Sequence, residues 1–217
     1  RLFRNKAAVG SMIVLGTLTF LAIFGPFFWP HDYETIYNDR VLQGPSWEHL
    51  HIFGTDPQGR DLFVRLLYGL RMSLAVGLVA TGVSLLIGVI WGATAGYIGG
   101  RVDQIMMRIV DVLYALPFIF FVIILMVVFG RNLILIFVAI GAVEWLTMAR
   151  IVRGQTISLR KKEFVEAAES AGVTSASIVT RHIVPNVLGP VVVYVTLTIP
   201  AVILTESFLS FLGLGVQ

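Results

Sequence analysis

The chain has 217 residues, of which 57% are hydrophobic and only 13% are charged, and its mean hydropathy is +0.86. Water-soluble domains carry about 25% charged residues, so the composition indicates that lipid surrounds most of this chain. The net charge of +3 comes from basic residues at the ends of apolar runs, which argues against a nucleic-acid-binding surface. The absence of cysteine excludes disulfides, thiolate metal sites and cysteine nucleophiles.

Five apolar segments are long enough to cross a bilayer, which takes about 20 helical residues. The sequence therefore predicts an all-α, polytopic membrane protein. The first apolar run is too long for a cleavable signal and lacks a small-residue cleavage pattern. In chain order the predicted spans run from Ala7 to Trp29, from about Met72 to Arg101, between Asp111 and Arg131, from Asn132 to about Ala149, and from about Val187 to Thr205.

The placement of lysine and arginine predicts a cytoplasmic N-terminus, because short inside loops are enriched in basic residues. With that orientation, segments 1–6, 101–111 and 150–182 lie inside and hold eleven of the sixteen basic residues. The outside segment 30–71 holds four basic and six acidic residues.

The outer loop contains a run of turn-forming residues at 55–59, followed by a segment, 61–70, with apolar residues on one helical face. We predict a short helix on the outer membrane surface here, with Asp61 and Arg65 as an ion pair four residues apart. The alternative is a plain solvated connector. His49 and His51 form a His-x-His pattern without an evident third ligand, so we expect no metal site.

The longest inside loop, 150–182, has the pattern of a helix, a turn and a second helix. Good helix formers occupy 163–169, and Gly172 allows a sharp reversal. Thr174, Ser175 or Ser177 then begins a second short helix that must end before Pro185.

Small residues repeat every fourth position along the second predicted span, where they allow another helix to approach closely. The contact is either a moving one, with a partner protein as one candidate, or static packing. The row continues from Ala80 and Ser84 through Gly88, Gly92, Gly96 and Gly100.

Glu144 lies about 18 Å along the fourth predicted span and must face protein or water. It either lines a translocation path or pairs with an arginine such as Arg150 or Arg108. Pro117 and Pro200 fall inside predicted spans, where each is expected to kink or break the helix.

Several motifs in the chain resemble those of the membrane permeases of binding-protein-dependent ABC importers, and nearly the whole chain takes part in the resemblance. The signature of that family's cytoplasmic loop is matched by Glu166-Ala167-Ala168, by Gly172 four residues later, and by His182-Ile183-Val184-Pro185. The peptide-importing branch, and its C-subunit permeases in particular, is further matched by Phe53-Gly54-Thr55-Asp56, Gly59-Arg60-Asp61, Leu67-Tyr68-Gly69, Ala149–Thr156 and Ser210-Phe211-Leu212-Gly213-Leu214-Gly215.

This resemblance implies a type I importer permease fold with two parts: 1–71, a span with a periplasmic loop and surface helix, and 72–217, the permease core. Its coupling loop, at about 150–186, would dock on a separate ATPase subunit. The residues expected to dock are Glu166, Ala167, Ala168, Gly172, Val173 and Thr174.

The implied partners are two ATPase subunits, a homologous second permease, a periplasmic peptide-binding protein and the peptide itself, all in the bacterial inner membrane or beside it. ATP and Mg²⁺ would bind to the ATPases, because this chain contains no G-x-x-x-x-G-K-[ST] phosphate loop, and we expect no cofactor or catalytic residue here. Such permeases have six spans, so a sixth span and a leading segment are expected to be missing. The cargo, whether oligopeptide, dipeptide, nickel or another solute, is left open.

Two other functions are weighed against this one. A secondary transporter would carry coupling acids near mid-membrane and detectable repeats, whereas only Glu144 lies at depth. An intramembrane enzyme would need a nucleophile or metal set at depth, and the sequence offers none.

Overall fold

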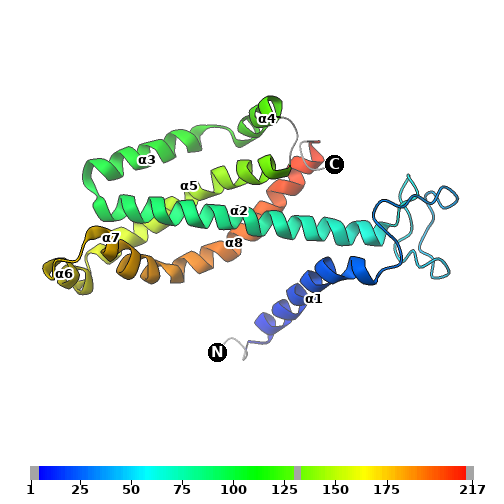
Figure 1. Ribbon diagram of the computed structural model, residues 1–217, viewed down its shortest axis with the longest axis horizontal. Coiled ribbons are helices and arrows are strands. Elements are labelled where there is room, and N and C mark those ends of the chain that lie inside the picture. Colours follow the sequence, from blue (N-terminus) through cyan, green and yellow to red (C-terminus); the bar gives the residue numbers. More distant parts are fainter. Residues whose placement is uncertain (1–4, 130–132, 214–217) are drawn as a thin grey trace. The chain divides into compact units, whose positions relative to one another are not determined.

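Figure 1 shows the computed structural model of the chain, which describes residues 5–129 and 133–213, apart from the side chains of 118, 119, 125, 126, 129 and 133–139. The residues described are mostly helical, as predicted, and form no β-strand. The chain divides into two compact units, Arg1–Ala75 and Val76–Gln217. The elements are α1 (Lys6–Phe28), α2 (Leu62–Ile98), α3 (Gly100–Ala115), α4 (Phe118–Phe129), α5 (Leu133–Arg160), α6 (Glu163–Ser170), α7 (Ser175–Ile178), a π-turn (Val179–Ile183) and α8 (Val184–Phe211).

Helix α1 confirms the first predicted span. Asn5 precedes the helix in an extended conformation, and its Oδ1 accepts a hydrogen bond of 3.1 Å from the Ala7 amide. This contact satisfies one of the free amides at the helix start. Near its other end, Gly25 lies so close to Leu67 of α2 that an added Cβ would be 2.8 Å from the leucine side chain.

Helix α2 differs from the prediction, because the expected surface helix at 61–70 is not a separate element. It forms the first turns of one 37-residue helix that continues to Ile98. Only Gly69 weakens helix propensity near the expected boundary, and extending an existing helix costs far less than starting a new one. At 1.5 Å per residue, α2 is about 55 Å long, well beyond the ~30 Å of a hydrocarbon core.

The third predicted span is wrong as a single helix. It is divided between α3 and α4, with the break at Leu116 and Pro117. The break agrees with the expectation for Pro117, which disfavours a helical conformation of the preceding residue. Helix α3 begins at Gly100, because Gly99 and Gly100, with φ of +70° and +57°, turn the chain directly after α2.

The last two predicted spans both lie in longer helices. Helix α5 passes the expected end at Ala149 and continues to Arg160, while the expected boundary at Arg131 and Asn132 lies outside the described residues. Helix α8 contains Pro190 and Pro200 and continues through both, so the expected break at Pro200 is absent from this described helix. Within the described ranges, three helical stretches are long and apolar enough to cross a membrane: Lys6–Phe28, Leu62–Ile98 and Ser175–Phe211.

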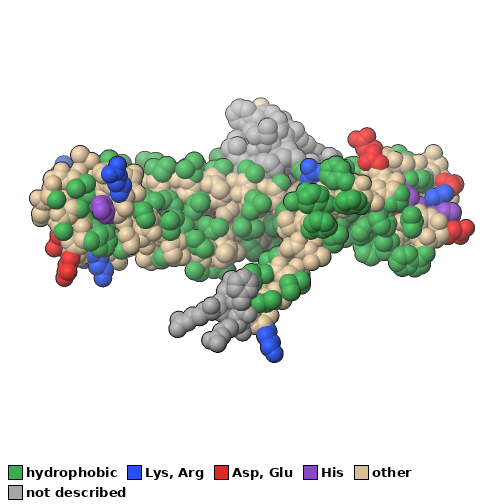
Figure 2. All heavy atoms as spheres, turned by 60° about the horizontal axis from the view of Figure 1, so that its bottom comes forward, with side chains coloured by type: hydrophobic (Ala, Val, Ile, Leu, Met, Phe, Trp, Pro, Cys, Tyr) green, Lys and Arg blue, Asp and Glu red, His purple; other side chains and the backbone are tan. Residues whose placement is uncertain are grey.

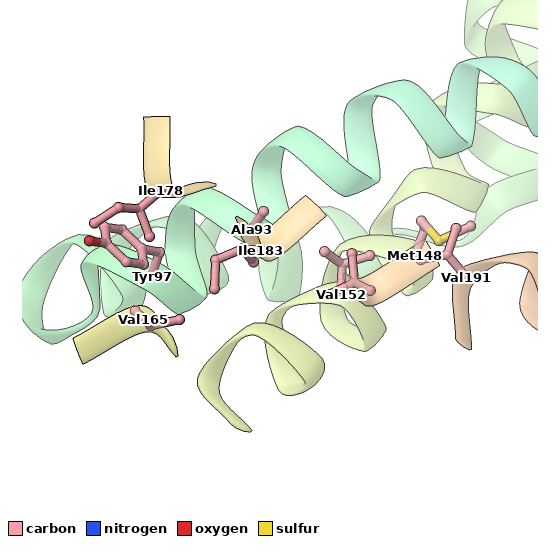
Figure 3. Packing of buried hydrophobic residues seen from close by; sticks show 9 residues of the cluster. Ala93, Tyr97, Met148, Val152, Val165, Ile178, Ile183 and Val191 are labelled. Carbon is pink, nitrogen blue, oxygen red and sulfur yellow. The ribbon is translucent and has the colours of Figure 1, made fainter. Parts of the chain in front are cut away.

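The largest apolar core of the second unit joins the end of α2 to α5 and to the segment from α6 to α8. Its members, several of them seen from close by in Figure 3, include Ala93, Tyr97, Met148, Val152, Val165, Ile178, Ile183, Val187 and Val191. On the face seen in Figure 2, the charged side chains of this unit gather at the end formed by α6 and α7. The stretch beyond that end shows apolar and uncharged side chains, as expected of a surface in contact with lipid.

Candidate functional site

The helix expected to couple the chain to a partner is present as α6, Glu163–Ser170. Glu163 and Glu166 lie in its first turn, where negative charge stabilises a helix N-terminus. Its C-terminus closes with Gly172 at φ +75° and two hydrogen bonds, from Gly172 N–H to the Glu169 carbonyl (3.0 Å) and from Val173 N–H to the Ala168 carbonyl (3.1 Å). This is a Schellman motif, so the predicted turn at Gly172 is confirmed in its physical detail.

One face of α6 is anchored in the apolar core. Val165 is fully buried, and Ala168 and Val173 pack against the same cluster, which includes Ile178. In Figure 3, Val165 and Ile178 lie near Tyr97, which comes from the end of α2. This buried face therefore fixes α6 to the ends of α2 and α5.

The opposite face of α6 is exposed within the described part of the second unit. Glu166, Ala167, Gly172 and Thr174 are exposed, whereas Ala168 and Val173 are half-buried. The six residues predicted to dock are therefore neighbours in space, with four on the outside and two holding the turn in place. We call these six residues, with α6 itself, the coupling knob.

A hydrogen bond that sequence reasoning missed ties the coupling knob to α2. The Tyr97 hydroxyl donates to Glu169 Oε1 over 2.9 Å, and Tyr97 is only 6% exposed. The Arg160 guanidinium lies 5.7 Å from the centre of the Tyr97 ring and donates to the Ile98 carbonyl. Tyr97 and Glu169 are 72 positions apart, and no sequence motif links them.

An open cavity of about 440 Å³ lies beside the coupling knob. Charged groups of both signs line it, from α3, from the end of α5, from the turn that follows α5 and from α6. Its charged lining residues are Asp103, Arg160, Lys161, Glu166 and Glu169.

The segment after Gly172 corrects the prediction of a second, separate helix. A helix does begin at Ser175, directly after Thr174 as expected. It does not end before Pro185, because the π-turn Val179–Ile183 carries it into α8. Pro185 therefore stands inside a continuous helical stretch, directly after the π-turn, and its missing N–H leaves one carbonyl of the preceding turn without a backbone donor.

The glycine row of α2 packs against α5 of the same chain. A Cβ added to Gly88 would lie 2.5 Å from the Met148 side chain, and one added to Gly92 would lie 2.4 Å from the Ala149 carbonyl oxygen. At Gly96 the nearest atoms belong to Arg153 and Thr156, at 2.8 Å.

Gly100 does not belong to this contact. No described atom lies within 4 Å of a Cβ added there, and its positive φ assigns it to the turn before α3. The row therefore serves close packing within the chain from Gly88 to Gly96.

Among the described residues of the second unit, two ion pairs join α3 to α5. Arg153 binds Asp103 with two hydrogen bonds, and Arg150 binds Asp111 over 2.9 Å while lying over the Tyr114 ring. Arg150 is thus not the partner of Glu144. Glu144 is half-buried and forms no ion pair within the described part of the chain.

The loop between α1 and α2 also corrects a prediction, because Asp61 and Arg65 do not pair. Asp61 is fully buried, accepts from the Val64 amide at the start of α2 (2.8 Å), and binds His51 Nδ1 (2.7 Å). Arg65 instead binds Asp56 (2.8 Å). Asp61 and Arg65 thus each bind a residue of the loop instead of each other.

Asp56 organises the turn that the sequence predicted at 55–59. Its Oδ1 accepts from the amides of Gln58 (2.8 Å) and Arg60 (2.9 Å). Burial alone would raise the pKa of the Asp56 carboxyl. The backbone hydrogen bonds of Arg60 and Gln58, with the charges of Arg65 and Arg60, nevertheless hold that pKa below its ordinary value of 3.8.

Together, apolar helices of membrane-crossing length and a charged end carrying a small anchored helix are the features of a helical membrane protein. The chain belongs to the family described as the binding-protein-dependent transport system inner membrane component, whose model matches residues 84–217. Residues 1–45 match the N-terminal transmembrane domain of oligopeptide transport permease C. The chain is thus a multi-pass protein of the inner membrane.

Among curated proteins, the chain is similar to oligopeptide transport system permease proteins OppC. It is 52% identical to that of Haemophilus influenzae, over 100% of this chain and 70% of that protein, and 52% identical to that of Escherichia coli K12, over 100% and 72%. It is 46% identical to the dipeptide transport system permease protein DppC of Bacillus subtilis, over 100% and 67%.

Proposed function

We propose that this chain is a membrane permease subunit of an ATP-driven importer that carries oligopeptides across the inner membrane, and that the coupling knob docks on a separate ATPase subunit. The observation that carries the proposal is the two-faced packing of α6. Val165 is fully buried among the ends of long helices, while Glu166 and Ala167 are exposed in the described part of the chain. A docked element of this kind can transmit displacement because it is fixed to the membrane helices and not to a loose loop.

The partners follow from this division of labour. Two ATPase subunits bind ATP and Mg²⁺, and a second homologous permease completes the pathway. A periplasmic binding protein delivers the peptide. The absence of a phosphate-loop motif from these 217 residues supports the assignment of ATP hydrolysis to other chains.

In the proposed orientation the N-terminus is cytoplasmic, which places the coupling knob inside and the 30–61 loop outside. Support comes from the distribution of basic residues, since segments 1–6, 101–111 and 150–182 hold eleven of sixteen.

Oligopeptides are the proposed cargo because relatives at 52% identity are named oligopeptide permeases. The dipeptide permease at 46% and the glutathione permease GsiD of Pectobacterium atrosepticum at 37% are more distant. Glu144 is the proposed polar contact in the pathway. It is half-buried at depth, and the nearby Arg150 pairs with Asp111.

Reversal of the charge at Glu166 tests the docking. We expect Glu166→Lys to reduce both ATPase co-purification and peptide uptake at least tenfold, equal to about 1.4 kcal/mol of docking free energy. Glu48→Lys is the matched control, because it makes the same charge change at an exposed position of the outer loop. Full co-purification and full uptake by Glu166→Lys would refute docking through the coupling knob.

A further inference from the structure

The outer loop contains a buried cluster of side chains for which the proposed function has no role. His51 and Asp61 are fully buried, and His31 is 9% exposed. The His31 and His51 rings stack with centroids 4.2 Å apart, and Tyr37 meets both rings edge-on. One possible ligand atom from each of His31, His51 and Asp61 lies within 4.8 Å of the other two. The neighbours of His51 in this cluster are therefore His31 and Asp61, and the His49-x-His51 pattern in the sequence does not include them.

The hydrogen bonds indicate which nitrogen of each neutral ring holds a free lone pair. His31 Nε2 lies 2.9 Å from the His49 carbonyl oxygen, which can only accept, so Nε2 carries the proton and Nδ1 the lone pair. That Nδ1 lies 2.8 Å from the Tyr37 hydroxyl, which donates to it. His51 Nδ1 donates to the Asp61 carboxylate over 2.7 Å, so the lone pair of His51 is on Nε2.

His51 Nε2 is buried and has no hydrogen-bond partner among the described residues. Buried polar atoms are normally paired, so a solitary one requires an explanation. Histidines that bind metals donate their other N–H to a carboxylate or a backbone carbonyl, which fixes the ring and its tautomer. His51 does so to Asp61, and His31 does so to the His49 carbonyl.

We propose that His51 Nε2 and His31 Nδ1 bind a divalent transition-metal ion, with Asp61 and the His49 carbonyl orienting the two rings and water completing the coordination. Imidazole nitrogens suit Zn²⁺, Cu²⁺ and Ni²⁺, whereas Mg²⁺ and Ca²⁺ prefer oxygen ligands. Zn²⁺ is therefore the informative probe, and Mg²⁺ is its control.

Binding requires one local movement. The stacked rings are inclined by only 21°, so their lone pairs run nearly side by side and do not converge on one point. An ion about 2.0–2.1 Å from both nitrogens needs the His31 ring to turn and to exchange the Tyr37 hydroxyl for the metal. His51 is fully buried and fixed by its hydrogen bond to Asp61, whereas His31 is 9% exposed and lies three residues after the end of α1. The ion would fasten the segment after α1 to the turn that precedes α2.

The test uses the full chain in its detergent-solubilised complex after treatment with a chelator. Titration calorimetry with Zn²⁺ is expected to show one saturable site per chain. Zn²⁺ is also expected to raise the unfolding temperature of the complex, because an ion that binds the folded state stabilises it. Mg²⁺ at the same concentration should do neither.

Two substitutions remove the ligand nitrogens and keep the orienting hydrogen bonds. His51→Asn retains a donor toward Asp61 and lacks Nε2, while His31→Gln retains a donor toward the His49 carbonyl and lacks Nδ1. Each is expected to weaken Zn²⁺ binding at least tenfold. His49→Gln is the control, because its side chain forms no hydrogen bond within the described part of the loop and the substitution keeps the carbonyl.

Absence of saturable Zn²⁺ binding by the unaltered complex would overturn the proposal, and so would unchanged affinity in both His51→Asn and His31→Gln. Equal loss in His49→Gln would also overturn it. If the substituted chains fail to fold, Co²⁺ bound to the unaltered chain decides. Visible absorption typical of histidine-ligated Co²⁺ supports the site, and the spectrum of hydrated Co²⁺ refutes it.

Discussion

Replacement of Gly92 by alanine is the sharpest test of how α2 packs on α5. The new Cβ would lie 2.4 Å from the Ala149 carbonyl oxygen and 2.9 Å from the Arg153 amide nitrogen. Both are backbone atoms, so neither can turn aside as a flexible side chain can. The two helices would have to separate by about 1 Å for the closest contact to reach an ordinary distance of 3.4 Å.

The expected magnitude combines two opposing effects. Overpacking of this kind costs about 1–3 kcal/mol, whereas alanine in place of glycine inside a helix gains up to about 1 kcal/mol. Gly82→Ala in the same helix isolates the second effect, because no atom of the described residues lies within 4 Å of its added Cβ. The free energies of unfolding of the two variants should therefore differ by about 1–3 kcal/mol.

Thermal unfolding of both variants in the same detergent measures this difference. For a chain of this size, 1 kcal/mol corresponds to about 2–4 °C, so Gly92→Ala should unfold roughly 2–12 °C below Gly82→Ala. Equal unfolding temperatures, or a higher one for Gly92→Ala, would refute the close packing of α2 on α5.

Three further predictions concern single side chains. Tyr97→Phe removes the hydrogen bond to Glu169 and should cost about 1 kcal/mol of local stability, seen as faster amide hydrogen exchange in α6 with the unfolding temperature nearly unchanged. Asp56 has a lowered pKa in the folded state, so its ionised carboxylate stabilises the fold fully above pH 3.8, and this contribution is lost as the pH falls through the lower folded pKa. Asp56→Asn should remove this acid dependence from unfolding measured as a function of pH, and should lower the free energy of unfolding by about 2 kcal/mol. Glu144→Gln should lower peptide uptake in reconstituted vesicles without lowering ATPase co-purification.

Local signals in the sequence were sufficient for the coupling knob. Helix formers at 163–169 and Gly172 determine α6 and its closing turn, because both depend on residues a few positions apart. The boundaries of the long helices were not predictable in the same way. The predicted spans were bounded by charges such as Arg101 and Arg150, whereas α5 continues to Arg160, because a helix does not need to end at a membrane surface.

Side-chain contacts between residues distant in sequence were the other feature that the sequence did not predict. The spacing of Asp61 and Arg65 satisfies a helical ion pair, but His51 and Asp56 compete for these two side chains and win, because the fold brings them closer. The contact of Tyr97 with Glu169 depends in the same way on the fold and leaves no trace in residue spacing.

The π-turn at Val179–Ile183 has a mechanical consequence. It leaves the stretch from Ser175 to Phe211 helical over 37 residues, about 55 Å, without an irregular linker. A shift imposed at Ser175 would therefore be carried toward Phe211 through helix alone, with Pro190 and Pro200 as the interior positions that lack a backbone N–H. A flexible connection at Pro185 would instead absorb such a shift before it entered α8.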